Sequence, residues 1–186
     1  MSGITPFQTV GPFFDFGLEF EGGDIVASDV ADGVHIVIEG TLRDGAGDPV
    51  PDAILEVWQA NAAGKYRHPL DDRRMPLDPG VDGFGRVATT TEGRFSFRTI
   101  LPGRVPAPDG RWQSPHLVMS VLARGILTRL ATRIYFEDEP TLPDDPILAL
   151  VPERRRGTLI ASRVDADHYR FDIVLQGPGE TVFFDV

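Results

Sequence analysis

The chain has 186 residues, of which 41% are hydrophobic and 25% charged, with a formal net charge of −10 and no cysteine. This composition is that of a folded protein and excludes an intrinsically disordered chain, while the negative charge argues against binding to phosphate backbones. The lack of cysteine excludes disulfides, iron–sulfur clusters and thiolate metal sites.

The N-terminal sequence, Met-Ser-Gly-Ile-Thr-Pro-Phe, lacks the basic and apolar regions of a secretory signal peptide. No apolar run approaches the roughly 20 residues that a membrane-spanning helix needs. We therefore expect a cytoplasmic protein, and the length favours a single domain over residues 1–186.

Residues 1–33 are expected to form an N-terminal arm and lead-in. Rigid turn formers and large apolar side chains are mixed in the stretch Thr5-Pro6-Phe7-Gln8-Thr9-Val10-Gly11-Pro12-Phe13-Phe14. Such a segment is unfavourable when it is fully exposed, so we expect it to pack on another surface. The sequence leaves two possibilities open: the arm lies on its own domain, or it lies on another chain.

Seven segments have the composition of β-strands: residues 35–42, 53–60, 94–100, 116–123, 130–136, 169–175 and 181–184. The alternation is clearest in 94–100, where Phe95 and Phe97 share one face. The 20 glycines and 16 prolines favour many short strands joined by turns. The pattern therefore predicts an all-β fold, a β-sandwich with an N-terminal arm and long loops.

Two segments depart from the strand pattern. Residues 61–92 predict a long loop, which retains enough large apolar side chains, Tyr66 and Phe84 among them, to be ordered. Residues 145–150 predict a helix, with Asp145 as its N-cap and Pro146 at its first position. The charged runs 71–74 and 154–156 are expected to be solvated loop residues.

Several spaced motifs follow one another along the chain. They are Gly-x-Pro-Val-x-x-Ala-x-Leu-x-Val-Trp-Gln-Ala-x-x-x-Gly-x-Tyr at residues 47–66, Asp-Gly-Phe-Gly-Arg at 82–86, Thr-Thr-Glu-Gly-Arg-Phe-Ser-Phe-Arg-Thr-Ile at 90–100, and Pro-Gly at 102–103. Together they resemble the intradiol ring-cleavage dioxygenases over most of the chain, which implies a transthyretin-like sandwich. The stretches 8–12 and 177–185 resemble the alpha chains of two-chain members of that family.

In that family two tyrosines and two histidines hold a ferric ion, which activates a chelated catechol. Tyr66 matches the first tyrosine and His116 the first histidine, but Val105 and Val118 stand at the other two positions. Gln113 replaces an arginine that precedes the histidine pair. Because valine has no lone pair to donate, the resemblance implies no metal ligand and no catalytic residue on this chain.

The resemblance implies a partner instead. A homologous beta chain would hold Fe(III) and cleave 3,4-dihydroxybenzoate with O2 to 3-carboxy-cis,cis-muconate, and this chain would complete the substrate pocket. Thr9, Gly11 and Pro12 match a family motif that approaches the partner's active site. Arg124 matches an arginine that borders the substrate, where it would supply charge and hydrogen bonds to a carboxylate.

Each of these residues also has a purely structural interpretation. Tyr66 can be a loop tyrosine held by its ring, His116 a buried histidine with a hydrogen-bond partner, and Arg124 a surface arginine after a strand. Two rival functions stay open as well. One is a stand-alone small-molecule binding module on the same sandwich, and the other is a self-sufficient dioxygenase with a different iron site.

Overall fold

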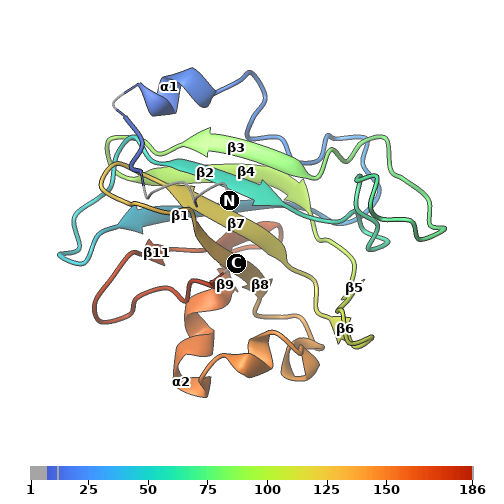
Figure 1. Cartoon of the computed structure of the whole chain (residues 1–186). Helices are drawn as coiled ribbons and strands as arrows, with labels where there is room; N and C mark the ends of the chain where they lie inside the picture. The colour runs from blue at the N-terminus through green and yellow to red at the C-terminus, as the bar shows by residue number, and fades with distance from the viewer. Residues whose placement is uncertain (1–7, 12, 186) are drawn as a thin grey trace, which may run out of the picture.

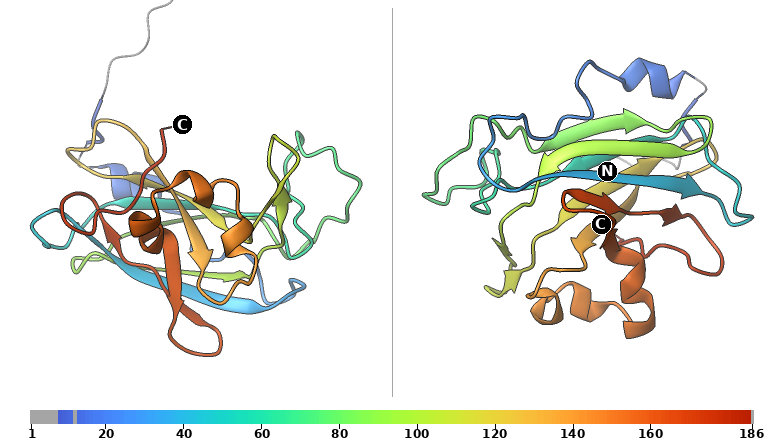
Figure 2. Two further views of the ribbon diagram at one scale, coloured as in Figure 1. Left: turned by 90° about the horizontal axis from the view of Figure 1, so that it is seen from below. Right: turned by 180° about the vertical axis from the view of Figure 1, so that it is seen from behind.

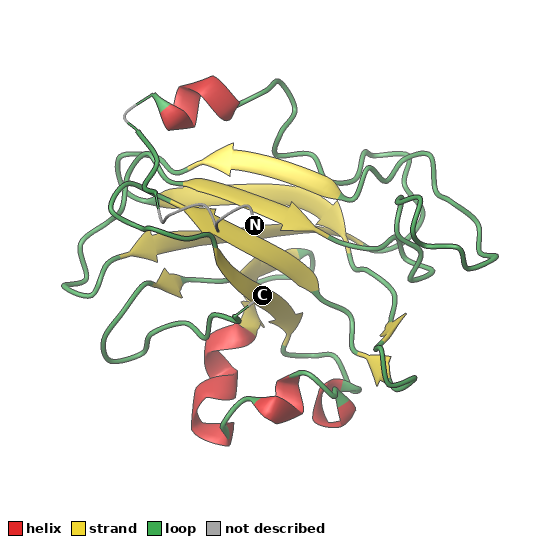
Figure 3. Cartoon of the chain, viewed as in Figure 1, coloured by secondary structure: helices red, strands yellow, loops and turns green. Residues whose placement is uncertain are grey.

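Strands make up most of the regular structure in the computed structural model, which describes residues 8–11 and 13–185 (Figure 1). The strands are β1 (His35–Arg43), β2 (Ile54–Trp58), β3 (Phe84–Ala88), β4 (Arg94–Ile100), β5 (Val105–Pro106), β6 (Trp112–Gln113), β7 (Leu117–Leu122), β8 (Leu130–Phe136), β9 (Ile160–Arg163), β10 (His168–Arg170) and β11 (Ile173–Val174). The helical elements are short: α1 (Phe14–Leu18), α2 (Glu153–Arg156) and the 3-10 turns η1 (Leu142–Asp144), η2 (Leu148–Leu150) and η3 (Gly157–Leu159) (Figure 3).

One hydrogen-bonded path connects nine of the strands. Eight of them follow the order β11-β1-β10-β9-β8-β7-β2-β3, and the ninth, β4, pairs with the other edge of β1. The remaining strands, β5 and β6, pair only with each other. The pairs β2–β3, β2–β7, β7–β8 and β1–β4 are antiparallel, whereas β8–β9 and β1–β10 are parallel. Because β3 and β4 also lie close together, the strands curl around a common interior.

The interior is filled by the inward-facing side chains of β1 and β4 on one side and of β2, β7 and β8 on the other. In β1 and β4, apolar residues such as Ile38 and Phe97 are fully buried, and in β2, β7 and β8 so are Leu55, Met119 and Ile134. Each such side chain contributes about 1.5–3 kcal/mol through its removal from water. The opposite faces of β2, β7 and β8 are therefore free to carry a site.

The helical segments lie on opposite sides of the strands (Figure 2). α1 lies beyond β3, while the turns between residues 142 and 159 cover the outer face of β8 and form a second small core with Tyr135, Leu148 and Leu159. No helix within residues 8–11 and 13–185 has the length and apolar character needed to cross a membrane.

The mostly-β expectation is confirmed, and the segment 130–136 coincides with β8. Three expectations were wrong in detail. β3 lies inside the stretch expected to be loop, residues 169–175 are divided into β10 and β11, and residues 181–184 form a single bridge at Phe184 rather than a strand.

The expected helix at residues 145–150 is reduced to the one-turn η2. The N-cap of this turn is Ile147 rather than the expected Asp145, although Asp145 Oδ1 accepts hydrogen bonds from the N–H groups of Ile147 at 2.9 Å and Leu148 at 2.7 Å.

Candidate functional site

The outer face of β2, β7 and β8 brings together the positions that the family resemblance connects with iron. Strand pairing places Val118 beside Trp58 on one side and beside Arg133 on the other. His116 precedes β7 and lies two residues before Val118, so both side chains point to the same face of the sheet. Its imidazole is buried, and its Nδ1 donates to the Ser114 carbonyl oxygen at 2.7 Å.

Tyr66 reaches this face from the loop after β2. Its ring stacks on Trp58, with centroids 6.1 Å apart and planes 3° apart. A cavity of about 370 Å³ lies beside the two rings, with Val105 of β5 in its wall. Burial raises the pKa of Tyr66, although the charges of Arg133 and Arg73 oppose this shift. The neutral phenol is therefore the stable form.

Arg133 is the residue that sequence reasoning missed. Its Nη1 donates to Gln113 Oε1 at 2.6 Å and to Tyr135 Oη at 3.2 Å. Together with burial, its charge lowers the pKa of His116 to about 4. The alternation of β8 places Arg133 and Tyr135 on one face, opposite the buried Ile134, but only the pairing of β8 with β7 shows that this is the Val118 face.

This arrangement does not fit a ferric ion. Of the four family positions, two carry valines, which have no donor atom, so only Tyr66 and His116 could contribute a ligand. The guanidinium of Arg133 lies close enough to influence the pKa of both Tyr66 and His116. Across the described ranges, no group of three His, Cys, Asp or Glu side chains could hold a metal.

A buried charge cluster supports the loop that carries Tyr66. Asp71 accepts hydrogen bonds from Lys65 Nζ at 3.1 Å and from Arg73 Nη2 at 2.6 Å, and its Oδ2 also accepts the Tyr66 N–H at 2.9 Å. The Arg73 hydrogen bond holds the pKa of the Asp71 carboxyl well below its usual range. The expectation of solvated charges was therefore wrong for Asp71, whose side chain is only 8% exposed.

The candidate substrate residues form a second region, distant in sequence but joined in space. The Thr9 hydroxyl accepts a hydrogen bond from the Gly125 N–H at 2.8 Å, so the arm contacts the turn that presents Arg124. Arg124 Nη2 donates to Asp52 Oδ2 at 3.0 Å, and both side chains are about half exposed, at 56% and 48%. Gly11 is exposed in the turn before α1, where a Cβ would meet no atom within 4 Å, and Pro12 lies outside the described residues.

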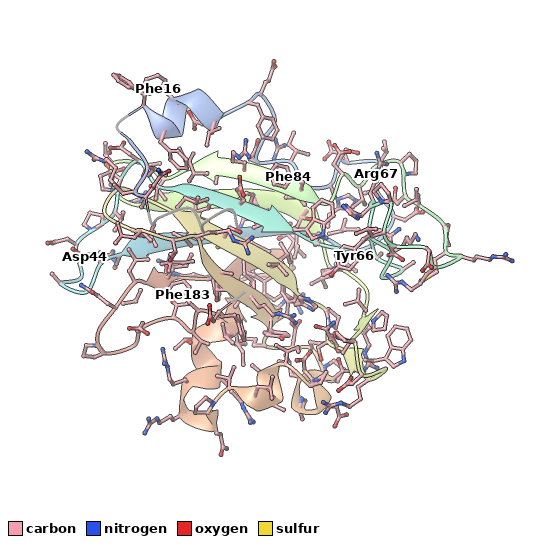
Figure 4. All side chains as sticks on the ribbon, in the orientation of Figure 1. Phe16, Asp44, Tyr66, Arg67, Phe84 and Phe183 are labelled. Carbon is pink, nitrogen blue, oxygen red and sulfur yellow. The ribbon has the colours of Figure 1, made fainter. Side chains whose placement is uncertain are left out.

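The arm does not bury all of its own apolar groups. Phe13 and Phe16 are 73% and 63% exposed, and Figure 4 shows Phe16 on the outer side of α1. Phe20, by contrast, stacks on Phe84 of β3 with centroids 6.4 Å apart. Thus part of the arm packs on its own chain, and α1 presents an apolar surface to the outside.

The fold is that of a dioxygenase. The dioxygenase family model matches residues 11–177, and the chain belongs to this family. The chain is 44% identical to the protocatechuate 3,4-dioxygenase alpha chain of Burkholderia cepacia, with 98% of this chain and 97% of the relative aligned. It is 42% identical to the beta chain from the same organism, over 80% of this chain and 67% of that relative.

A solved structure with a similar fold is the dioxygenase domain of a carbohydrate-binding fusion protein from Streptomyces sp. SirexAA-E. The TM-score is 0.64 at 26% identity, over 92% of this chain and 97% of that one. The resemblance drawn from the motifs is therefore confirmed.

Proposed function

We propose that this chain is the alpha subunit of a heteromeric protocatechuate 3,4-dioxygenase. The observation that carries the proposal is the 44% identity to such an alpha chain over nearly the whole length of both proteins. The complex would cleave the ring of 3,4-dihydroxybenzoate with O2 to give 3-carboxy-cis,cis-muconate. We place it in the cytoplasm, as one domain on a two-layer transthyretin-like sandwich.

The iron would be held by a homologous beta chain. Val105 and Val118 support this assignment, because they leave the corresponding positions of this chain without donors. When bound, a ferric ion would supply chelation and activation of the catechol. The similarity of this chain to a beta chain supports a complex of two related folds.

This chain would complete the substrate pocket of its partner. Thr9, Gly11, Pro12 and Arg124 are the proposed substrate-binding residues, and the hydrogen bond from Gly125 to Thr9 supports their acting as one unit. Arg124 would bind the carboxylate of the substrate through charge-assisted hydrogen bonds. Gly11 is suited to a close approach of backbone and ligand because it has no Cβ.

The exposed phenylalanines of the arm support a permanent partner. Phe13 and Phe16 would be buried against the beta chain, which is typical of the apolar centre of a stable interface. A stand-alone binding module would instead leave these rings in water.

Co-expression tests the proposal. This chain is produced alone, together with a beta chain, and the beta chain is produced alone, and each preparation is assayed with 3,4-dihydroxybenzoate. We expect the two chains to copurify and to turn over the substrate, while this chain alone has neither activity nor the red-brown colour of tyrosinate-bound iron. A stable monomer that does not bind the beta chain would contradict the proposal.

A further inference from the structure

The guanidinium of Arg133 is half-buried, and no carboxylate among the described residues pairs with it. Its Nη1 contacts only the neutral groups of Gln113 and Tyr135, and it belongs to none of the ion pairs within the described part of the chain. Within the same residues, its Nε and Nη2 donate no hydrogen bond. Neither nitrogen is among the buried atoms without a partner, so both are accessible from solvent, and their N–H groups can bind an anion from outside the chain.

The nearest buried carboxylate does not fill this role. Asp145 accepts hydrogen bonds from Tyr135 Oη and from the N–H groups of Ser114, Ile147 and Leu148, at 2.7–3.1 Å. Four donors thus satisfy Asp145, and the Tyr135 hydroxyl separates it from Arg133. The negative charge of Asp145 is therefore directed toward backbone amides and a phenol.

Arg133 also forms part of the wall of a cavity of about 430 Å³ on the outer face of β7 and β8. Arg129 contributes a second guanidinium, and Val118, Ile147, Leu150 and Phe184 contribute apolar walls. The guanidinium carbon of Arg133 lies 5.9 Å from the centre of the Phe184 ring. Among the described lining residues, Asp185 carries the one carboxylate, against the two guanidinium groups of Arg129 and Arg133.

Two guanidinium groups and an apolar wall select a particular kind of ligand. The volume falls within the roughly 300–1,000 Å³ of small-molecule sites. Arginine binds carboxylates with its planar fork of N–H groups, and the apolar walls favour a hydrophobic body over a hydrated inorganic anion. We propose that this cavity is a non-catalytic binding site for a small aromatic carboxylate, with Arg133 as its principal contact.

The proposal gives a reason for the charge on this face. At this face the donor-free Val118 and the guanidinium groups of Arg129 and Arg133 suit an anionic ligand. The site is separate from Thr9 and Arg124, and it requires no iron. It therefore stands independently of the function proposed above.

Titration calorimetry with benzoate tests this site on the full chain, purified with any partner that accompanies it. Benzoate has no catechol hydroxyls, so it reports carboxylate binding without ring cleavage. We expect binding that Arg133→Gln weakens at least tenfold, while Arg154→Gln, on α2, leaves it unchanged. Benzyl alcohol, which has the same ring without the charge, is expected not to bind.

A second pair of variants avoids altering the buried network. Leu150 is 76% exposed, so Leu150→Glu is expected to fold normally and to place a competing carboxylate at the cavity. It should weaken benzoate binding, whereas Leu150→Gln should not. Unchanged binding in both Arg133→Gln and Leu150→Glu would overturn the proposal. So would an absence of benzoate binding to the assembled complex, the result expected if a partner's carboxylate fills the cavity.

Discussion

The Thr9 hydroxyl and the Gly125 N–H are 2.8 Å apart and form a hydrogen bond between segments separated by 116 residues. This contact joins the N-terminal arm to the turn that presents Arg124. It connects the two sequence segments that carry the proposed substrate-binding residues, and it makes their relative position testable.

Replacing Thr9 by valine removes the acceptor while preserving the shape of the side chain. A neutral hydrogen bond contributes about 1 kcal/mol, so kcat/KM of the assembled complex for 3,4-dihydroxybenzoate should fall about fivefold. Thr9→Ser retains the hydroxyl and should behave as the wild type. Steady-state kinetics of the three complexes would show whether the arm is positioned by this contact, and equal activity of all three would refute it.

Replacing Arg124 by alanine should affect carboxylated substrates selectively. A charge-assisted hydrogen bond contributes roughly 1.5–3 kcal/mol, which corresponds to a tenfold or greater loss of kcat/KM on 3,4-dihydroxybenzoate. Plain catechol, which lacks the carboxylate, should lose little. Asp52→Asn is the control, because it removes the partially exposed ion pair but leaves the charge of Arg124. Equal losses on the two substrates would assign Arg124 a structural role.

His116 should make the folded chain acid-sensitive. Its pKa in the folded protein is lowered to about 4 by burial and by Arg133, so between about pH 6.5 and 4 the unfolded state takes up a proton that the folded state excludes. Stability therefore decreases as the pH falls through this window. Between pH 7.5 and 5, the free energy of unfolding should fall by about 2 kcal/mol more in the wild type than in His116→Gln. Urea unfolding at the two pH values measures the difference, and parallel losses would contradict it.

Asp71 should stabilise the loop that carries Tyr66. Breaking a buried ion pair leaves its partners unpaired, so Asp71→Asn should lower the free energy of unfolding at pH 7 by roughly 3 kcal/mol. Because the pKa of Asp71 is depressed, its contribution is present above the ordinary carboxyl range and is lost as the pH falls below about 4. The exposed neighbour provides the control Asp72→Asn, which should have little effect at either pH. A similar effect of both substitutions would show that burial of Asp71 is unimportant.

Sequence periodicity predicted the central strands because their alternation reflects burial on one face, as Phe95 and Phe97 of β4 show. It missed β3, where Gly83 and Gly85 suggest a loop. Gly85 is required for another reason: a Cβ there would lie 2.7 Å from Val26 Cγ2 of the lead-in. The break between β10 and β11 was also hidden from the sequence. At this break Asp172 Oδ1 accepts the hydrogen bond from the Thr41 N–H, which a backbone carbonyl would accept in a continuous strand.

The sequence predicted the residue types of the candidate site but not all of its contacts. The family resemblance implied that Val105 and Val118 stand at two iron-ligand positions. The position of Arg133 was not predicted, because it depends on the register between β7 and β8, and the burial of Asp71 depends on how a long loop folds onto Lys65. The local sequence pattern predicts which residues share one face of a strand. Contacts between segments that are distant in sequence can be identified only from the three-dimensional structure.

The iron content of the purified complex tests the central claim most directly. Metal analysis and the absorbance of tyrosinate-bound iron would be measured on the complex and on this chain alone. The account predicts one iron for each pair of chains, with none retained by this chain. Two irons for each pair, or stoichiometric iron on this chain alone, would show that Tyr66 and His116 still belong to a working metal site and would contradict the account.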